Sequence, residues 1–356
     1  MTTKKPMSPW TMPVVAVAIL LLTTAVLVTL WTWVNGQAWT DPEKRTLAQL
    51  DVVKVASGIA LGGGGLFTLY LAARRQRHQE QAQADTNADA EARRITELYT
   101  KAVQQLGEPQ APVRLGGLYA LERLGQQHSD MQQTIVDVLC AYLRMPYTPP
   151  EDPSVQVEAQ QEREVRLTAQ RILATHLRPN NMGIYWGQRR IDLTGAVLIN
   201  FTLNRCRPWA ATFDGARFLG ETDFRDAEFR WTTSFAGASF EGRTHFQEAA
   251  FGYRTEFERA SFGQFVSFQQ ASFFEVSFNE AVFSGSADFG EASFEGPATF
   301  RRAAFSSAVW FTGASFAQVP GFDDKSFSDL PMFEGASFSD VRTGSAPPPR
   351  PPTPES

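Results

Sequence analysis

Two cysteines and four histidines are the side chains best suited to nucleophilic or metal chemistry in this chain of 356 residues. Cys140 and Cys206 lie far apart in the sequence and in different predicted domains, so we expect two free thiols in a reducing compartment. The histidines share no ligand spacing with each other or with a cysteine; they are His78, His128, His176 and His245. This pattern predicts no metal site.

Carboxylates and a glycine run are the other features that could carry chemistry. Glu275 and Glu280 occupy repeat positions that hold Gln, Ser or Thr elsewhere, whereas catalysis needs titratable groups that converge in a cavity. Gly62 to Gly65 is not followed by the Lys-Ser/Thr pair of a phosphate-binding loop. We therefore predict no catalytic, cofactor-binding or metal-binding residues, no cofactor and no enzymatic activity.

Regularly spaced phenylalanines, here called the ladder, dominate the second half of the chain. Of the 28 phenylalanines, 24 recur every five or six residues, and Phe265 and Phe274 are the two that fall off the ladder within this stretch. The steps alternate five and six, except for two successive fives from Phe273 to Phe283. The rungs are Phe213, Phe218, Phe224, Phe229, Phe235, Phe240, Phe246, Phe251, Phe257, Phe262, Phe268, Phe273, Phe278, Phe283, Phe289, Phe294, Phe300, Phe305, Phe311, Phe316, Phe322, Phe327, Phe333 and Phe338.

Small, β-branched or proline residues stand two positions before the rungs, as Ala260 and Thr255 do, with Lys325 as an exception. A separation of two places both side chains on the same side of an extended backbone. A helix with an 11-residue repeat is the alternative, but steps of five would scatter Phe around it and Gly occurs in almost every repeat. The pattern favours a solenoid of short extended segments with Phe stacked on Phe.

The repeated A-x-F-x-x pattern resembles the pentapeptide-repeat proteins, in the variant with Phe at the central position. The resemblance covers Ile191 to about Phe338, and Leu193, Leu198 and Leu203 continue the five-residue steps backwards. It implies a right-handed quadrilateral parallel β-helix, in which the central residue and the one two before it point inward. The alternating sixes predict about 22 residues per coil, with an extra residue at a corner.

The N-terminal part of the chain predicts a transmembrane helix hairpin within residues 1–75. Residues 13–34 contain no charged side chain, and residues 52–73 form a second apolar span in which only Lys54 is charged. A cleaved signal peptide is the alternative for the first span, but the apolar run is longer than usual and no cleavage site follows closely. In the second span, Gly58 and Gly62 form a GxxxG pair, extended by Gly63, Gly64 and Gly65, that favours close approach of the first span or of a second copy.

Basic residues outside the two spans predict the orientation. Lys4 and Lys5 precede the first span, and Arg74, Arg75 and Arg77 follow the second. This bias predicts a multi-pass protein of the bacterial inner membrane with both its N- and C-termini cytoplasmic.

Between the hairpin and the ladder, residues 76–93 read as a polar stalk that is flexible or helical, and residues 94–180 as an α-helical juxtamembrane or capping region. Apolar faces predict a helix with Ile95, Leu98, Tyr99, Ala102, Val103 and Leu106, a second with Leu118, Tyr119, Leu121 and Leu124, a third near 131–145 and a fourth near 161–177. An adaptor or dimerisation role is the alternative to a spacer that caps the β-helix of residues 191–340.

The phrase YTKAVQQLGEPQAPVRLGGLYALERLG in this region, after two spans and before the repeats, is similar to a segment of actinobacterial membrane-anchored pentapeptide-repeat proteins. This resemblance implies no known chemistry.

Charge divides unevenly along the chain. Residues 191–340 hold 20 Asp and Glu against 11 Lys and Arg, a net −9, so the rest carries about +4 of the total −5. Five arginines cluster around the solenoid start, where ordinary surface charge and contact with anionic lipid are the two interpretations; they are Arg178, Arg189, Arg190, Arg205 and Arg207. Residues 341–356 read as a Pro-rich disordered tail, with docking in an aromatic groove as the alternative.

These features predict a non-enzymatic, membrane-anchored scaffold that presents an acidic β-helix to an unknown protein partner at the cytoplasmic face. The alternative, implied by the family resemblance, is a DNA-mimicking inhibitor or modulator of a type II topoisomerase. We expect no direct nucleic-acid binding, because the acidic rod would repel phosphate. A homodimer is predicted through the Gly58/Gly62 span or the solenoid end.

Overall fold

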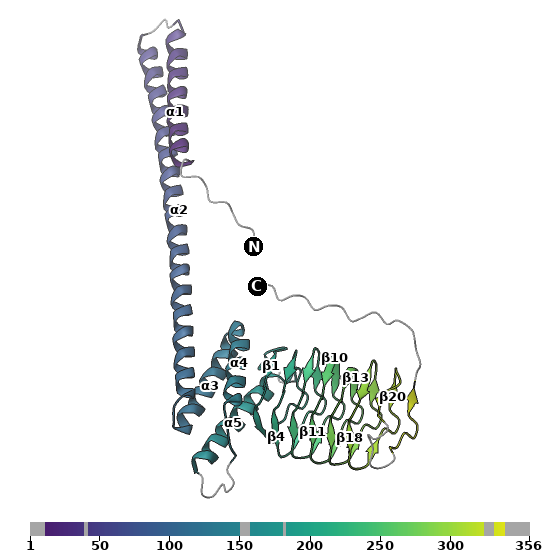
Figure 1. The fold of residues 1–356 in the computed structure, drawn as a ribbon. Coiled ribbons are helices and arrows are strands. Elements are labelled where there is room, and N and C mark those ends of the chain that lie inside the picture. Colours follow the sequence, from purple (N-terminus) through teal and green to yellow (C-terminus); the bar gives the residue numbers. More distant parts are fainter. Residues whose placement is uncertain (1–10, 39–41, 150–156, 181–182, 324–330, 339–356) are drawn as a thin grey trace. The chain divides into compact units, whose positions relative to one another are not determined.

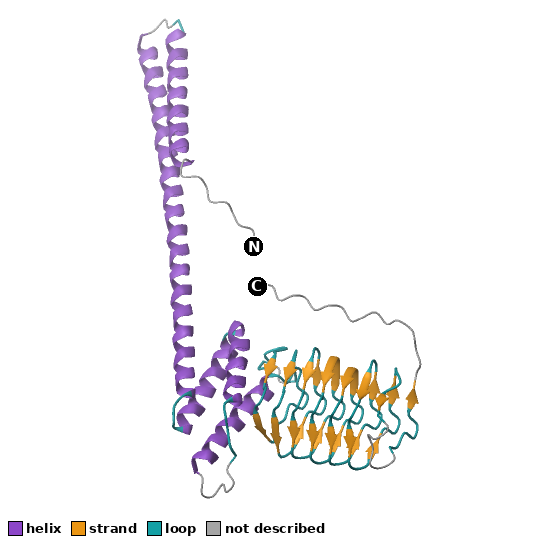
Figure 2. Cartoon of the chain, in the orientation of Figure 1, coloured by secondary structure: helices purple, strands orange, loops and turns teal. Residues whose placement is uncertain are grey.

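The structure, a computed structural model, describes residues 11–38, 42–149, 157–180, 183–323 and 331–338. It divides into two compact units, Met1–Arg94 and Ile95–Ser356. Several residues used in the sequence predictions lie outside the described ranges, among them Lys4, Lys5, Lys325, Phe327 and the Pro-rich tail. Figures 1 and 2 show the elements of both units.

In the first unit, α1 (Thr11–Gly36) lies alongside the first part of α2 (Pro42–Leu106), as Figure 1 shows. At the connection, Asn35 Oδ1 accepts hydrogen bonds from Arg45 Nη2 at 3.1 Å and from Gln49 Nε2 at 3.0 Å. These contacts close an antiparallel helix pair, and Val34 and Val52 are buried beside them.

Both helices contain segments that are long and apolar enough to span a membrane. Their apolar side chains are largely exposed, with Leu20 at 66% and Leu61 at 78%, so this surface is the one that lipid would cover. Thr23 and Thr24 donate their hydroxyl protons to the carbonyl oxygens of Ile19 and Leu20, both at 2.8 Å, which suits helices in hydrocarbon. The α2 helix continues without a break through residues 76–93, the predicted stalk.

Three further helices follow in the second unit: α3 (Ala111–Gln127), α4 (Gln132–Arg144) and α5 (Val157–His176), with a short 3-10 turn, η1 (Ser129–Met131), before α4. Gly117 allows α3 to pack closely on α2, because a Cβ there would lie 2.8 Å from the carbonyl oxygen of Ala102. Leu118, Leu121 and Leu124 are buried, as predicted.

The apolar faces predicted for the end of α2 and for α3 were too wide. Leu98 is 45% exposed, Val103 36% and Tyr119 48%, so all three lie at the edge of the packed stripe or outside it. The cause is that α3 packs through Gly117 and Gly125, two residues that a search for apolar periodicity passes over.

The repeat region is a parallel β-solenoid of about six turns with four faces. The strand pairs stack the same face of successive turns in register. The long strands β10 (Ala250–Glu256) and β13 (Ser272–Ser277) run from the fourth face of one turn onto the first face of the next. The predicted quadrilateral, parallel architecture is confirmed, and its right-handed sense stays a prediction.

The remaining strands are distributed over the faces as follows. The first face holds β1 (Ile191–Asp192), β3 (Ala211–Thr212), β7 (Thr233–Ser234), β17 (Ala298–Phe300) and β21 (Gly321–Phe322). The second holds β2 (Val197–Ile199), β4 (Arg217–Leu219), β8 (Ser239–Phe240), β11 (Ser261–Phe262), β14 (Val282–Phe283) and β18 (Ala304–Phe305). The third holds β5 (Thr222–Asp223), β9 (Thr244–His245), β12 (Val266–Ser267), β15 (Ala287–Asp288) and β19 (Val309–Trp310). The fourth holds β6 (Glu228–Phe229), β16 (Ser293–Phe294), β20 (Ser315–Phe316) and β22 (Ser337–Phe338).

The alternating steps correspond to two kinds of corner. Five-residue steps cross the corner between the first and second faces, and between the third and fourth, in a tight turn such as Phe246 to Ala249, whose N–H donates to the Phe246 carbonyl oxygen at 3.1 Å. The third residue of that turn, Glu248, has φ 57°, the left-handed region that favours glycine, and Gly237 fills the same place at φ 66°. The other two corners hold the six-residue steps, as predicted, except for the five-residue step from Phe273 to Phe278 between the fourth and first faces.

Phenylalanine fills the interior. Rings in successive turns stack nearly parallel, for example Phe246 on Phe268 with centroids 4.8 Å apart and 2° between planes. Within a turn they meet edge to face, as Phe246 and Phe257 do at 5.6 Å and 82°. The small residues two positions before the rungs are buried as predicted as far as Pro320, whereas Pro331 and Ala336 are only partly buried and Phe338, in the last described turn, is 48% exposed.

Helices α4 and α5 cover the first turn of the solenoid, whose strands are β1 and β2. Gln170 of α5 pairs with Ile199 twice, accepting from its N–H at 3.0 Å and donating to its carbonyl oxygen at 2.8 Å. These two bonds occupy backbone groups that a further strand would otherwise use, which favours the capping interpretation of this helical region.

Candidate functional site

A groove lies on the third face of the solenoid. It has a volume of about 530 Å³ and extends over three successive turns. Its lining residues are Phe265, Gln269, Gln270, Asp288, Gly290, Glu291, Trp310 and Thr312. Asp288 and Trp310 are register partners on β15 and β19, so they project side by side from the outer surface of the sheet. Phe265 belongs to the preceding turn, which places aromatic side chains in both outer turns of the groove.

The groove is acidic. None of its lining residues is basic. Gln270 donates from Nε2 to Glu291 Oε2 at 2.8 Å, and Gly290 donates its N–H to Asp288 Oδ1 at 2.9 Å. Burial raises the pKa of the Asp288 carboxyl above its ordinary value, and the bond from Gly290 only partly offsets this effect. A carboxylate held in this way is stabilised by an incoming cation.

The sequence predictions missed this groove. Its residues come from positions 265 to 312, and they meet because the solenoid stacks them at successive turns. One signal was available, since Phe265 is an aromatic residue off the ladder and therefore pointed to an outward ring.

Comparison with known families gives a result for the same region. The family model for pentapeptide repeats, in nine copies, matches residues 208–250 and 278–324. The solenoid therefore contains pentapeptide repeats in these two segments. The gap between the matched segments contains most of β10 and all of β13, where the corners depart from the regular alternation. No curated protein and no solved structure matches the chain, so the resemblance to actinobacterial membrane-anchored members stays a prediction.

Pentapeptide-repeat solenoids are typically non-catalytic, and no enzyme family matches the chain. Glu275 and Glu280, the carboxylates singled out in the sequence, belong to surface ion pairs of the repeats. Arg254 Nε lies 3.9 Å from Glu275 Oε1, and Arg302 pairs with Glu280.

The two cysteines are free and buried. Cys140 lies on α4, and Cys206 occupies the first place in a column of inward alanines, where its thiol donates to the Ala174 carbonyl oxygen at 3.3 Å. Burial raises the pKa of each thiol to about 12. Neither is therefore a thiolate at neutral pH, and neither can act as a nucleophile there.

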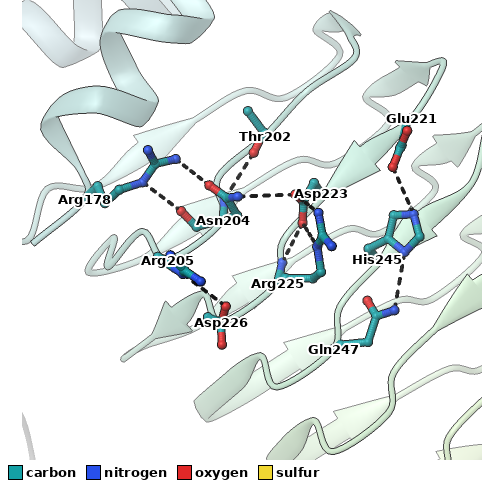
Figure 3. A network of polar contacts seen from close by, with 10 residues as sticks. All are labelled: Arg178, Thr202, Asn204, Arg205, Glu221, Asp223, Arg225, Asp226, His245 and Gln247. Carbon is teal, nitrogen blue, oxygen red and sulfur yellow. Dashed lines mark hydrogen bonds and ion pairs between the residues drawn. The ribbon is translucent and has the colours of Figure 1, made fainter. Parts of the chain in front are cut away.

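The histidines occupy separate environments. His176 is buried on α5, where Nε2 lies 2.8 Å from Glu122 Oε1, Nδ1 lies 2.6 Å from the Ile184 carbonyl oxygen, and the ring stacks on Trp186 at 4.0 Å. His245 lies on the third face, 3.2 Å from Glu221 and 3.4 Å from Gln247 (Figure 3). No group of three or more His, Cys, Asp and Glu able to hold a metal ion was found among the described residues.

The arginines around the solenoid start make contacts inside the unit. Arg178 donates to the Asn204 carbonyl oxygen at 3.1 Å, and Arg205 Nε lies 3.4 Å from Asp226 Oδ2, both drawn in Figure 3. Arg207 pairs with Glu228 at 2.5 Å, and Arg189 donates to Gln132 Oε1 at 2.6 Å. Arg178 and Arg189 thus join the helical cap to the first turns, whereas Arg205 and Arg207 pair with acids of the next turn. These contacts favour ordinary surface charge over contact with anionic lipid.

The glycine run of the second span approaches the first span at Gly63, as predicted. A Cβ at Gly63 would lie 3.2 Å from Ile19 Cγ2 of α1, whereas a Cβ at Gly58 or Gly62 would have nothing within 4 Å among the described atoms. Of the glycines in the run, Gly63 rather than the Gly58/Gly62 pair is therefore the one that lies against the first span. Dimerisation through Gly58 and Gly62, or through the solenoid end, stays a prediction.

Proposed function

We propose that this protein is a non-enzymatic, membrane-anchored scaffold whose pentapeptide-repeat solenoid binds a protein partner. The observation that carries the proposal is that different parts of the chain have surfaces suited to lipid and to a binding partner. Two helices expose apolar surface suited to lipid, and a rigid solenoid with a phenylalanine-filled interior has its outer faces available for binding.

The location we propose is the bacterial inner membrane, with both termini cytoplasmic. Arg74, Arg75 and Arg77 follow the apolar part of α2, and positively charged residues favour the cytoplasmic side. The free, buried thiols of Cys140 and Cys206 are compatible with a reducing compartment.

The acidic surface supports a protein partner more than it supports imitation of DNA. Arginines interrupt the negative charge, since Arg217 pairs with Glu241 at 2.8 Å and Arg225 with Asp223 at 2.8 Å. A mimic of the phosphate backbone needs a continuous negative track, and we therefore keep topoisomerase modulation as the alternative that the experiment must detect.

The test is crosslinking and affinity capture from native membranes with the full chain and with a chain lacking residues 1–75. We expect both forms to capture the same protein, because the solenoid carries the recognition. A full chain with Phe257→Asp, which should lose the solenoid fold, is the control and should capture nothing. Capture of a type II topoisomerase would support the alternative function, and partners that disappear with residues 1–75 would overturn the scaffold proposal.

A further inference from the structure

The acidic groove on the third face has carboxylates but no basic side chain in its lining. Asp288 and Glu291 contribute two carboxylates, and no guanidinium or ammonium group is among the lining residues. The acids elsewhere on the solenoid include several paired with arginine, such as Glu241, Glu228 and Glu280. The groove is therefore complementary to a cation that its own walls do not supply.

The aromatic side chains of the groove define a spacing. Phe265 and Trp310 are both half-buried and belong to turns two apart, so they are separated by about 10 Å along the solenoid axis, at about 4.8 Å per turn. The register aligns Trp310 with Ser267, so Phe265 is also displaced by two residues, or about 7 Å, along the strand direction. A polyproline II segment rises about 3.1 Å per residue, so about four residues lying obliquely across the turns span the two side chains.

The chain itself contains a segment with this chemistry. Residues 347–352 read Pro-Pro-Pro-Arg-Pro-Pro, so Pro348 and Pro351 are three apart with Arg350 next to the second. Proline-rich segments dock into aromatic grooves because their extended conformation needs little further ordering. A guanidinium beside them pairs well with carboxylates and with the face of an indole ring.

The position of the tail along the chain brings it within reach. Phe338 is the last described residue; it lies on β22, which pairs with β20 in the turn that also contains Trp310. From Phe338 to Pro347 there are nine residues, which span up to about 28 Å in a polyproline II conformation. The groove lies on the neighbouring face, within two turns of that point.

We propose that the groove formed by Phe265, Asp288, Glu291 and Trp310 binds the Pro-rich C-terminal tail of the same chain, residues 341–356, with Arg350 between the carboxylates. The tail then covers the third face and competes with any external Pro-rich, arginine-bearing ligand. This inference is independent of the scaffold function, since it concerns an intramolecular contact.

A second cluster of aromatic side chains does not suit this role. Trp209, Trp231 and Tyr253 are half-buried and stack on one another, with ring centroids 6.1 Å and 4.4 Å apart, so their stacked faces are already occupied.

The test places a photo-crosslinking residue, p-benzoylphenylalanine, at position 346 of the full chain in lipid nanodiscs. We expect crosslinks to peptides that contain Phe265, Asp288 or Trp310. Arg350→Glu, or the pair Asp288→Asn and Glu291→Gln, should lower the crosslink yield about tenfold, the loss of one charge-assisted contact. Glu241→Gln on another face is the matched control and should leave the yield unchanged.

A mixture of isotopically light and heavy copies tells the source of the tail. Crosslinks within one copy support the proposal, and crosslinks mainly between light and heavy copies overturn it in favour of a second molecule. Crosslinks that map elsewhere, or a yield unaffected by Arg350→Glu, also overturn it. As a second readout, a synthetic peptide of residues 343–353 should bind the Arg350→Glu chain about tenfold more tightly than the wild-type chain, whose own tail competes; equal binding to both would contradict the intramolecular contact.

Discussion

Phe257 lies face to face with Phe278, with ring centroids 4.8 Å apart and 2° between the planes. The same values hold between Phe235 and Phe257. The first pair is 21 residues apart in the chain and the second pair 22. The missing residue is absorbed at the corner where β10 and β13 pair, as a register shift between Phe251 and Arg254. The ring column is therefore maintained while the outer corner varies.

The column predicts a sharp difference between inward and outward phenylalanines. Phe257→Ala should lower the free energy of unfolding of the solenoid by about 3–5 kcal/mol, because it leaves a cavity between stacked rings. Phe257→Asp should abolish the fold, since it buries an unpaired charge. The measurement is thermal unfolding of the full chain followed by circular dichroism. Phe265→Ala, off the ladder, is the control and should cost less than about 1 kcal/mol; an equal loss in both variants would show that the inward assignment is wrong.

Buried threonine hydroxyls offer a stabilising change. Thr255 Oγ1 is buried and has no hydrogen-bond partner among the described residues, and the residue next to it in register is Val276. Thr255→Val keeps the shape and removes a desolvated hydroxyl, so we expect a gain of about 1 kcal/mol in unfolding free energy. Chemical denaturation measures it.

Thr244→Val is the control for that change, because Thr244 Oγ1 donates to the Gly242 carbonyl oxygen at 3.4 Å. It should give a smaller gain than Thr255→Val. A loss of stability in Thr255→Val would mean that its hydroxyl has a partner in the folded protein.

Two acids on the third face should respond to pH with opposite signs. Burial raises the pKa of Asp288 above its ordinary value of 3.8, so its ionisation destabilises the folded state. That penalty is absent below pH 3.8 and develops as the pH rises through the folded-state pKa. In a chain without residues 341–356, in which Arg350 cannot pair with Asp288, the substitution Asp288→Asn should therefore raise the melting temperature at neutral pH, and the two proteins should converge in acid.

Asp223 provides the matched comparison. Burial alone would raise its pKa, but the hydrogen bonds and charge of Arg225 outweigh burial and lower it. The stabilising contribution of Asp223 is present above pH 3.8 and is lost as the pH falls through the lowered value. Asp223→Asn should thus lower the melting temperature at neutral pH, with a difference that shrinks in acid; melting curves with the same sign for both variants would contradict these assignments.

The buried thiols allow a clean test of membrane orientation. Because the pKa of Cys140 and of Cys206 is raised to about 12, neither should react with a maleimide at neutral pH until the protein is unfolded. Labelling of an introduced cysteine can then be measured without a background from the two native thiols. In intact cells, a membrane-impermeant maleimide should label Gly36→Cys, in the connection between the two spans, and should label Ala82→Cys only after permeabilisation. The reverse pattern would invert the proposed topology.

The sequence by itself determined the solenoid and its interior. Inward residues such as Phe246 and Ala249 meet the same residue type in the next turn, so one short repeat specifies the contacts of every turn. The apolar runs of α1 and α2 were equally readable, because length and composition alone decide whether a helix can span a membrane.

Only the tertiary structure decided the outer surface and the packing of the helical cap. Asp288 and Trp310 become neighbours, and the guanidinium of Arg178 finds Asn204, through stacking of residues that are about 20 positions or more apart. The repeat leaves these outward positions free to vary, so no period predicts them. Leu98 and Tyr119 are exposed for a related reason, since a glycine contact at Gly117 sets the helix packing and has no signature in apolar spacing. Periodicity predicts the place of residues that contact the same residue type in the next turn. Residues that contact a different type of residue are placed by the tertiary structure.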